Sequence, residues 1–287
     1  MNLLKPQIAI RSANLDDRQR LANLIHFETH VHRHLDWRAP LDWIGYPPYL
    51  VLEQRKSLLA ALACSPDPPE VAWLRLFAVN GAFSRERAWE MLWGEALQQL
   101  QSQAIVSWAV ALSLWPWFSE LLASSGFSED NQVVMLNWTA GSLQQEQPPT
   151  GVVVRPMSLD DIGAVEAVDA VAFAPLWRNS RASLELAYRQ AILASVAAMD
   201  GQIVGYQIST ATPVGGHLAR LAVLPHLQGQ GIGSQLLNDL LQQFKRRNAQ
   251  KITVNTQRDN GASLRLYQKA GFYLTGESYP VFIYPLA

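Results

Sequence analysis

The chain has 287 residues, of which 49% are hydrophobic and 16% are charged, and its formal net charge at pH 7 is −1. Such a length favours two domains, and a charge so close to zero provides no bulk attraction to nucleic acid or to a membrane surface. The single cysteine, Cys64, excludes an intrachain disulfide and fits a reducing compartment. We also find no signal peptide and no apolar stretch long enough to span a bilayer, so a cytoplasmic location is expected.

Two stretches of the first half suggest local structure. His26, His30 and His34 recur every four residues. On a helix this spacing would place three imidazoles on one face, which suits a divalent metal, but no cysteine stands nearby and we expect a solvated helix face without metal. The longest apolar stretch, residues 104–118, is expected to form a buried strand followed by a helix.

The two halves of the chain echo one another across residues 144–151, a polar and proline-rich segment typical of a linker. The matched pairs are Ile10-Arg11 with Val154-Arg155 at a shift of 144, and Arg75-Leu76 with Arg220-Leu221 and Gly126-Phe127 with Gly271-Phe272 at a shift of 145. A register held through separate segments predicts two tandem domains of one fold, at residues 1–143 and 152–287.

The second half alternates strand-like and helix-like runs, which predicts an α/β fold with a mixed sheet. Asp200-Gly201 is a favourable hairpin turn, Ser158 is the expected N-cap of the first helix, and Gly271 is expected to end the last one. Strands are expected at residues 152–155, 196–199, 203–210, 218–224, 251–256, 272–275 and 281–284, and helices at residues 160–173, 183–195, 234–248 and 262–270.

The most informative stretch, Gln228-Gly229-Gln230-Gly231-Ile232-Gly233, joins the expected strand at 218–224 to the expected helix at 234–248. Its glycines allow a tight turn and let a ligand approach the backbone amides. The first amides of the helix lack intrahelical partners and lie at the positive end of its dipole, which predicts a phosphate site. The lysine of a P-loop is missing, and the glycine spacing is not that of a dinucleotide-binding loop.

The order Gln-x-x-Gly-x-Gly, preceded by Val223 and Pro225, resembles the acetyl-CoA loop of the Gcn5-related N-acetyltransferases, the GNAT family. Downstream, Asn260, then Tyr267, then Gly271-Phe272 resemble the second motif of that family. The resemblance implies a mixed sheet with helices on both faces, and with the internal repeat it implies a tandem protein.

The resemblance also implies how acetyl-CoA is bound. Its pantetheine arm would pair like a strand with the backbone of residues 221–223, where one N–H group would polarise the thioester carbonyl. The pyrophosphate would lie on the amides of the glycine turn. The predicted cofactor-binding residues are Leu221, Ala222, Val223, Gln228, Gly229, Gln230, Gly231, Ile232, Gly233, Ser234 and Asn260, the last of which either contacts the cofactor or caps the following helix.

Tyr267 is the predicted catalytic general acid, since the leaving thiolate needs a proton and a phenol with a pKa near ~10 is a suitable donor. The base stays open. Relatives that acetylate peptide N-termini often carry a glutamate where Asn255 stands, and an amide cannot accept the proton. Water, His217 or a residue of the expected acceptor loop at 172–181 remain as alternatives.

The overlay of the two halves predicts that only the second copy holds the cofactor. At the shift of 145, Gln228, Gly231 and Gly233 fall on Phe83, Glu86 and Ala88, while Asn260 and Tyr267 fall on Trp115 and Leu122. Side chains there would obstruct the turn, and the carboxylate would repel a pyrophosphate. The first domain is therefore expected to be a degenerate copy.

These observations predict an acetyl-CoA-dependent N-acetyltransferase whose C-terminal domain transfers acetyl, by direct attack, to a primary amine of a small molecule or peptide. We expect no metal and no nucleic-acid or membrane partner, and a monomer or weak homodimer. The alternative is a non-catalytic acyl-CoA-binding regulatory protein, which would bind the thioester without turnover.

Overall fold

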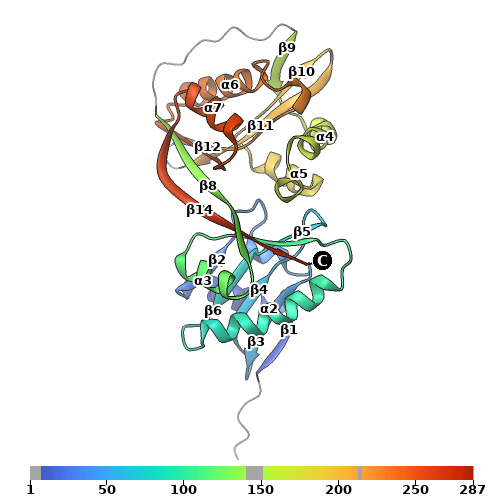
Figure 1. The fold of residues 1–287 in the computed structure, drawn as a ribbon, viewed down its shortest axis with the longest axis vertical. Helices are drawn as coiled ribbons and strands as arrows, with labels where there is room; N and C mark the ends of the chain where they lie inside the picture. Colours follow the sequence, from blue (N-terminus) through green and yellow to red (C-terminus); the bar gives the residue numbers. More distant parts are fainter. Residues whose placement is uncertain (1–7, 140–150, 213–214, 287) are drawn as a thin grey trace, which may run out of the picture. The chain divides into compact units, whose positions relative to one another are not determined.

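The computed structural model describes residues 8–139, 151–212 and 215–286 (Figure 1). Its chain divides into two compact units: unit 1 comprises residues 1–130 and 280–287, and unit 2 comprises residues 131–279. Apart from residue 151, the expected linker at 144–151 lies outside the described residues.

Unit 1 contains an antiparallel sheet with the strand order β1-β3-β4-β6-β2, and a second group in which β5 pairs in parallel with β7. Helix α2 packs its buried tryptophans, Trp89 and Trp93, into a core with strands β3, β4, β6 and β7. Residues 104–118 form a strand and the start of a helix, as predicted. The elements are β1 (Ala9–Ser12), η1 (Leu15–Asp17), α1 (Arg18–Phe27), β2 (His30–Arg33), η2 (Pro40–Trp43), β3 (Tyr49–Gln54), β4 (Ser57–Ala63), β5 (Val71–Trp73), β6 (Leu76–Val79), α2 (Arg85–Gln101), β7 (Trp108–Leu112) and α3 (Pro116–Ser124).

Unit 2 is built on a mixed sheet with the order β14-β8-β13-β12-β11-β10-β9, in which β12 and β13 run parallel. Helices α6 and α7 cover one face of this sheet, and α4 and α5 cover the other (Figure 1). This mixed α/β arrangement confirms the predicted fold class. The elements are β8 (Ser128–Thr139), β9 (Val152–Pro156), η3 (Leu159–Asp161), α4 (Ile162–Ala172), η4 (Pro175–Trp177), α5 (Arg181–Gln190), β10 (Leu193–Met199), β11 (Gln202–Thr212), β12 (Gly215–Val223), η5 (Pro225–Leu227), α6 (Ile232–Arg246), β13 (Lys251–Gln257), α7 (Gly261–Lys269) and β14 (Tyr273–Pro285).

Both units build the same turn between their first strand and first helix. In unit 1 the Asp17 carboxylate accepts hydrogen bonds from the Asn14 N–H at 3.0 Å and from Arg11 at 2.6 Å. In unit 2 the Asp161 carboxylate accepts from the Ser158 N–H at 2.8 Å and from Arg155 at 2.7 Å. The repeated sequence pattern thus corresponds to a repeated structure.

Two strands cross the boundary between the units. Strand β8 pairs with β13 through residues 133–139, and the end of β14 pairs with β7, placing Val281 opposite Leu112. The predicted separate strands at 272–275 and 281–284 are therefore wrong, since β14 is continuous and its two ends belong to different units. The backbone at Gly276 takes a φ of 90°, and the strand continues through it. The predicted boundary at residues 144–151 therefore differs from the limits of the units, because residues 131–139 belong to unit 2 and residues 280–286 belong to unit 1.

Two further predictions about local structure are wrong. The helix expected at 183–195 ends at Gln190, because Leu193 already pairs with Ser209 in the sheet. Helix α1 ends at Phe27, so His30 and His32 lie on strand β2 and the three histidines share no helix face. His32 is fully buried, with its Nε2 atom 2.9 Å from the Leu74 carbonyl oxygen.

The described residues show neither a metal site nor a membrane-spanning helix. They contain no group of three or more His, Cys, Asp or Glu side chains that could hold a metal ion. Within the same ranges, every helix is too short or too polar to cross a bilayer.

Candidate functional site

The glycine turn links β12 to α6 in unit 2, as the sequence predicted. Gly229 and Gly231 have φ angles of 78° and 89°, in the left-handed region that favours glycine. Gly231 is the N-cap of α6 and provides no side-chain cap, so the first amides of the helix remain available to an anion. The Gln228 side chain donates to the Val223 carbonyl oxygen at 3.0 Å, so it braces the turn.

Gly233 has a different role from the two glycines before it. It lies inside α6, where an added Cβ would be 3.3 Å from Leu266 of α7 and 3.9 Å from Leu221 of β12. Its lack of a side chain therefore lets α6 approach α7 and the central strand closely. This contact brings both sequence motifs to one place in the fold.

Next to the glycine turn, one backbone edge of strand β12 is open, in that none of the described residues pairs with it. On one side it pairs with β11 as far as Val223, but its register with β13 covers only Gly215–Leu218 against Lys251–Val254. A register shift in the β11 pairing makes Ala219 an extra residue, and such a bulge bends a strand and re-aims its groups. The two parallel strands therefore part after Leu218, beside the residues predicted to pair with pantetheine.

Tyr267 and Asn260 both lie on or next to α7. The Tyr267 side chain is only 5% exposed and packs with Phe272 in the core beneath α6. Burial raises its pKa to about 12, against a smaller lowering by a hydrogen bond with Ser263. The Asn260 Oδ1 atom accepts from the Ser263 N–H at 3.0 Å, so Asn260 caps α7, which was the simpler of its two predicted roles.

His217 lies on the paired part of β12, with its Nδ1 atom 2.8 Å from the Thr253 hydroxyl oxygen. Burial lowers the pKa of its imidazole, and hydrogen bonds with Asn255 and Thr253 raise it by less. The ring is therefore neutral at pH 7 and able to accept a proton. His217 therefore stays a candidate for the base, beside water and the predicted acceptor loop at residues 172–181.

An ion pair that the sequence analysis did not identify lies on the opposite face of the sheet from α6. The Arg220 guanidinium donates to the Asp169 carboxylate at 2.6 and 2.8 Å and to the Trp177 carbonyl oxygen at 2.6 Å. Asp169 is fully buried on α4 and also accepts from the Tyr206 hydroxyl. A charged residue within the apolar run of α4 was the available sequence signal, because an aspartate is rarely buried unless paired.

The corresponding strand edge in unit 1 is already occupied. At the shift of 145, Leu76, Phe77 and Ala78 of β6 fall on residues 221–223, and β2 pairs with them through His30–Arg33. At the turn before α2, the Ser84 hydroxyl accepts the Arg87 N–H at 3.2 Å, and Glu86 stands in the first turn of the helix. Both the edge and the helix terminus thus lack the features of a phosphate and pantetheine site.

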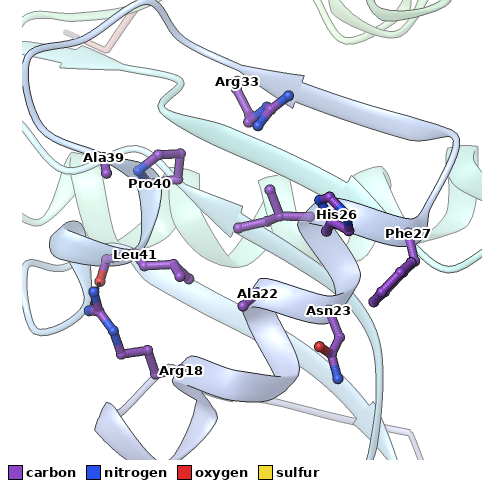
Figure 2. A pocket seen from close by; sticks show the side chains of 10 residues that line it. Arg18, Ala22, Asn23, His26, Phe27, Arg33, Ala39, Pro40 and Leu41 are labelled. Carbon is purple, nitrogen blue, oxygen red and sulfur yellow. Dashed lines mark hydrogen bonds between the residues drawn. The ribbon is translucent and has the colours of Figure 1, made fainter.

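A separate pocket of about 460 Å³ lies in unit 1 between α1, β2 and η2 (Figure 2). Arg18 at its rim already donates to the Leu41 carbonyl oxygen and to Asp42. None of the predicted site residues lines it, so we assign it no part in cofactor binding. The residues around it are Arg18, Ala22, Asn23, Ile25, His26, Phe27, Arg33, Ala39, Pro40 and Leu41.

Comparisons with known proteins point to one family and one fold. Residues 165–272 match the model of the Acetyltransferase (GNAT) family. An uncharacterised N-acetyltransferase of Methanocaldococcus jannaschii is 30% identical over 124 residues, which are 42% of this chain and 78% of that protein. N-alpha-acetyltransferase 30 of Schizosaccharomyces pombe is 33% identical over 84 residues, which are 26% of this chain and 56% of the yeast protein, so the match spans little more than half of that relative. A solved tandem GNAT protein from the clavulanic acid biosynthesis pathway superposes with a TM-score of 0.66 at 15% identity, over 99% of each chain.

Proposed function

Because the chain belongs to the Acetyltransferase (GNAT) family, we propose that unit 2 transfers an acetyl group from acetyl-CoA to a primary amine of a small molecule or a peptide. This membership supports catalysis by the chain over the alternative, a non-catalytic acyl-CoA-binding regulatory protein. The two predicted domains are copies of one fold, and in our proposal only the second is active.

The observation that carries the proposal is the open edge of β12 leading directly into the glycine turn. Pantetheine carries amides, and an unpaired strand edge offers them the same hydrogen bonds as a neighbouring strand. The turn then presents the first amides of α6 to the pyrophosphate at the positive end of the helix dipole. In unit 1 the same edge is covered by β2, which supports one acetyl-CoA per chain.

The reaction requires two proton transfers, and unit 2 offers a group for each. Attack of the amine nitrogen on the thioester carbonyl forms the amide bond and breaks the carbon–sulfur bond. The amine proton goes to a base, for which we propose His217 acting through water, and the leaving thiolate takes a proton from the Tyr267 hydroxyl. The Tyr267 phenol is protonated at neutral pH, and burial, which raises its pKa to about 12, makes it a weaker acid than an exposed tyrosine.

The acceptor amine would approach from the face of the sheet that carries α4, η4 and Arg220. The yeast relative is named an N-alpha-acetyltransferase, and we propose a peptide α-amine as the first acceptor to test, with small amines as the second. The residues that would contact it lie in the predicted loop at 172–181, around Trp177 and Arg178.

The direct test measures release of free CoA thiol from acetyl-CoA with a panel of peptides and small amines. We expect thiol release that depends on the amine, and a calorimetric stoichiometry of one acetyl-CoA per chain. Absence of both heat and thiol release would refute the proposal, and binding of two molecules would contradict the role assigned to unit 1.

A further inference from the structure

The segment that follows the first helix adopts two different positions in the two copies. In unit 1 it forms β2, which pairs with β6 and fills the strand edge at Leu76–Val79. At the shift of 145, residues 30–33 correspond to residues 175–178 in unit 2. There the chain forms the 3-10 helix η4 at Pro175–Trp177, and no strand in the described part of the chain pairs with the matching edge of β12.

In unit 2 this segment is held by a buried ion pair. The Arg220 guanidinium, whose side chain is 13% exposed, donates to the Trp177 carbonyl oxygen at 2.6 Å and lies 3.6 Å from the centre of the Phe173 ring. Asp169 holds the C-terminal end of this segment by accepting the Asn179 N–H at 2.9 Å. Arg220 and Asp169 thus fix both ends of residues 173–179, and each also binds the other.

In unit 1 the equivalent arginine is present but has different partners. At shifts of 144 and 145, Asp169 corresponds to Ile25 and Leu24, so α1 offers no carboxylate. Arg75 instead binds Asp36, which follows β2, at 2.7 Å, and its guanidinium lies 4.3 Å from the Trp43 ring centre. Arg75 therefore secures β2 on the strand edge of unit 1, because its carboxylate partner, Asp36, follows β2 and does not lie on helix α1.

We propose that the Arg220–Asp169 pair holds residues 173–179 away from the open edge of β12, and so keeps the acetyl-CoA slot accessible in the free protein. Both are positioning residues, and this role rests on the proposed function of unit 2. Pro175 acts in the same direction, since it lacks an N–H group and is unfavourable in a paired strand. Without the pair, residues 173–179 gain access to the edge that β2 occupies in unit 1.

Two variants test the proposal without leaving a charge buried alone, which would itself unfold the unit. The triple variant D169L/Y206F/R220M replaces the ion pair and the attached hydroxyl with apolar groups. Arg220→Lys keeps a positive charge beside Asp169 but loses the forked donor that reaches Trp177. The matched control is D36L/R75M in unit 1, which removes the equivalent pair from the copy whose edge is already filled.

The first measurement is hydrogen exchange of residues 218–224 without ligand. We expect slower exchange in the triple variant than in the wild type, a smaller slowing in Arg220→Lys, and no change in the unit 1 control. The second is the Kd of acetyl-CoA by calorimetry, which we expect to rise at least about tenfold in the triple variant because the open state becomes a minority. The same Kd is expected to stay at the wild-type value in the control.

The two measurements separate failure of this inference from failure of the proposed function. Unchanged exchange and unchanged Kd in folded variants would overturn the role of the pair while acetyl-CoA binding stands. Failure of the wild type to bind acetyl-CoA would overturn the proposed function. The exchange comparison needs no ligand and would still decide whether Arg220 and Asp169 hold the segment.

Discussion

Replacing Tyr267 with phenylalanine is expected to slow turnover strongly while leaving the fold and acetyl-CoA binding close to normal. The change removes one hydroxyl from a side chain that is 5% exposed and packed against Phe272. The hydroxyl has a hydrogen bond with Ser263, so the loss of stability should be about 1 kcal/mol. A positioned general acid contributes roughly 10²- to 10⁴-fold to rate, which corresponds to about 3–5 kcal/mol in the barrier.

The assay compares kcat from thiol release, the Kd of acetyl-CoA and the Tm for the wild type and Tyr267→Phe. Tyr49→Phe in unit 1 is the matched control, because the Tyr49 hydroxyl is also buried and has no hydrogen-bond partner among the described residues. We expect the control to leave kcat unchanged and to keep or raise Tm. A Tyr267→Phe variant with wild-type kcat would refute the assignment of the acid, whatever its Tm.

Three further predictions address the turn, the helix cap and unit 1. Gly229→Ala should lower the free energy of unfolding by roughly 1–2 kcal/mol through backbone strain alone, since φ is 78° and no atom lies within 4 Å of the added Cβ. Gly233→Ala should instead act by crowding Leu266. Equal Tm and acetyl-CoA Kd values for Gly229→Ala and the wild type would contradict the predicted strain. Asn260→Ala should lower the free energy of unfolding by about 1 kcal/mol through loss of the α7 cap, which would appear as a lower urea midpoint. The change in the Kd of acetyl-CoA should be no larger than this loss of stability accounts for. Burial lowers the pKa of His32 to about 4 from 6.5. The stability that the neutral imidazole gives the fold is therefore complete above pH 6.5 and is lost as the pH falls toward 4, by about 3 kcal/mol in the free energy of unfolding. In His32→Leu the free energy of unfolding in urea should depend less on pH over that window, and an unchanged pH dependence would count against this prediction.

The sequence predicted local backbone features better than the pairing of distant strands. Glycines with positive φ, a helix start without a side-chain cap and the hairpin turn at Asp200-Gly201 are local features, and each was found where the residue pattern placed it. The end of α5 was missed because Ala191 to Ser195 suits a helix as well as a strand, and pairing with β11 decided between them. The prediction of one helix face for His26, His30 and His34 is wrong, because α1 ends at Phe27 and the four-residue spacing continues by chance past the helix end.

What the sequence alone determined is the local backbone geometry of the turn at residues 228–233 and the repeat of one fold. For Asn260 the sequence left two roles open, and the structure shows the helix cap. What only the tertiary structure decided are pairings between distant residues, namely the exchange of β8 and β14, the occupation of one strand edge by β2, and the pairing of Arg220 with Asp169. An arginine stands at the same place in both copies, and its sequence neighbours do not reveal its partner. The partner of each arginine depends on which carboxylate the folded chain brings within reach, because a buried guanidinium is stable only when it is paired.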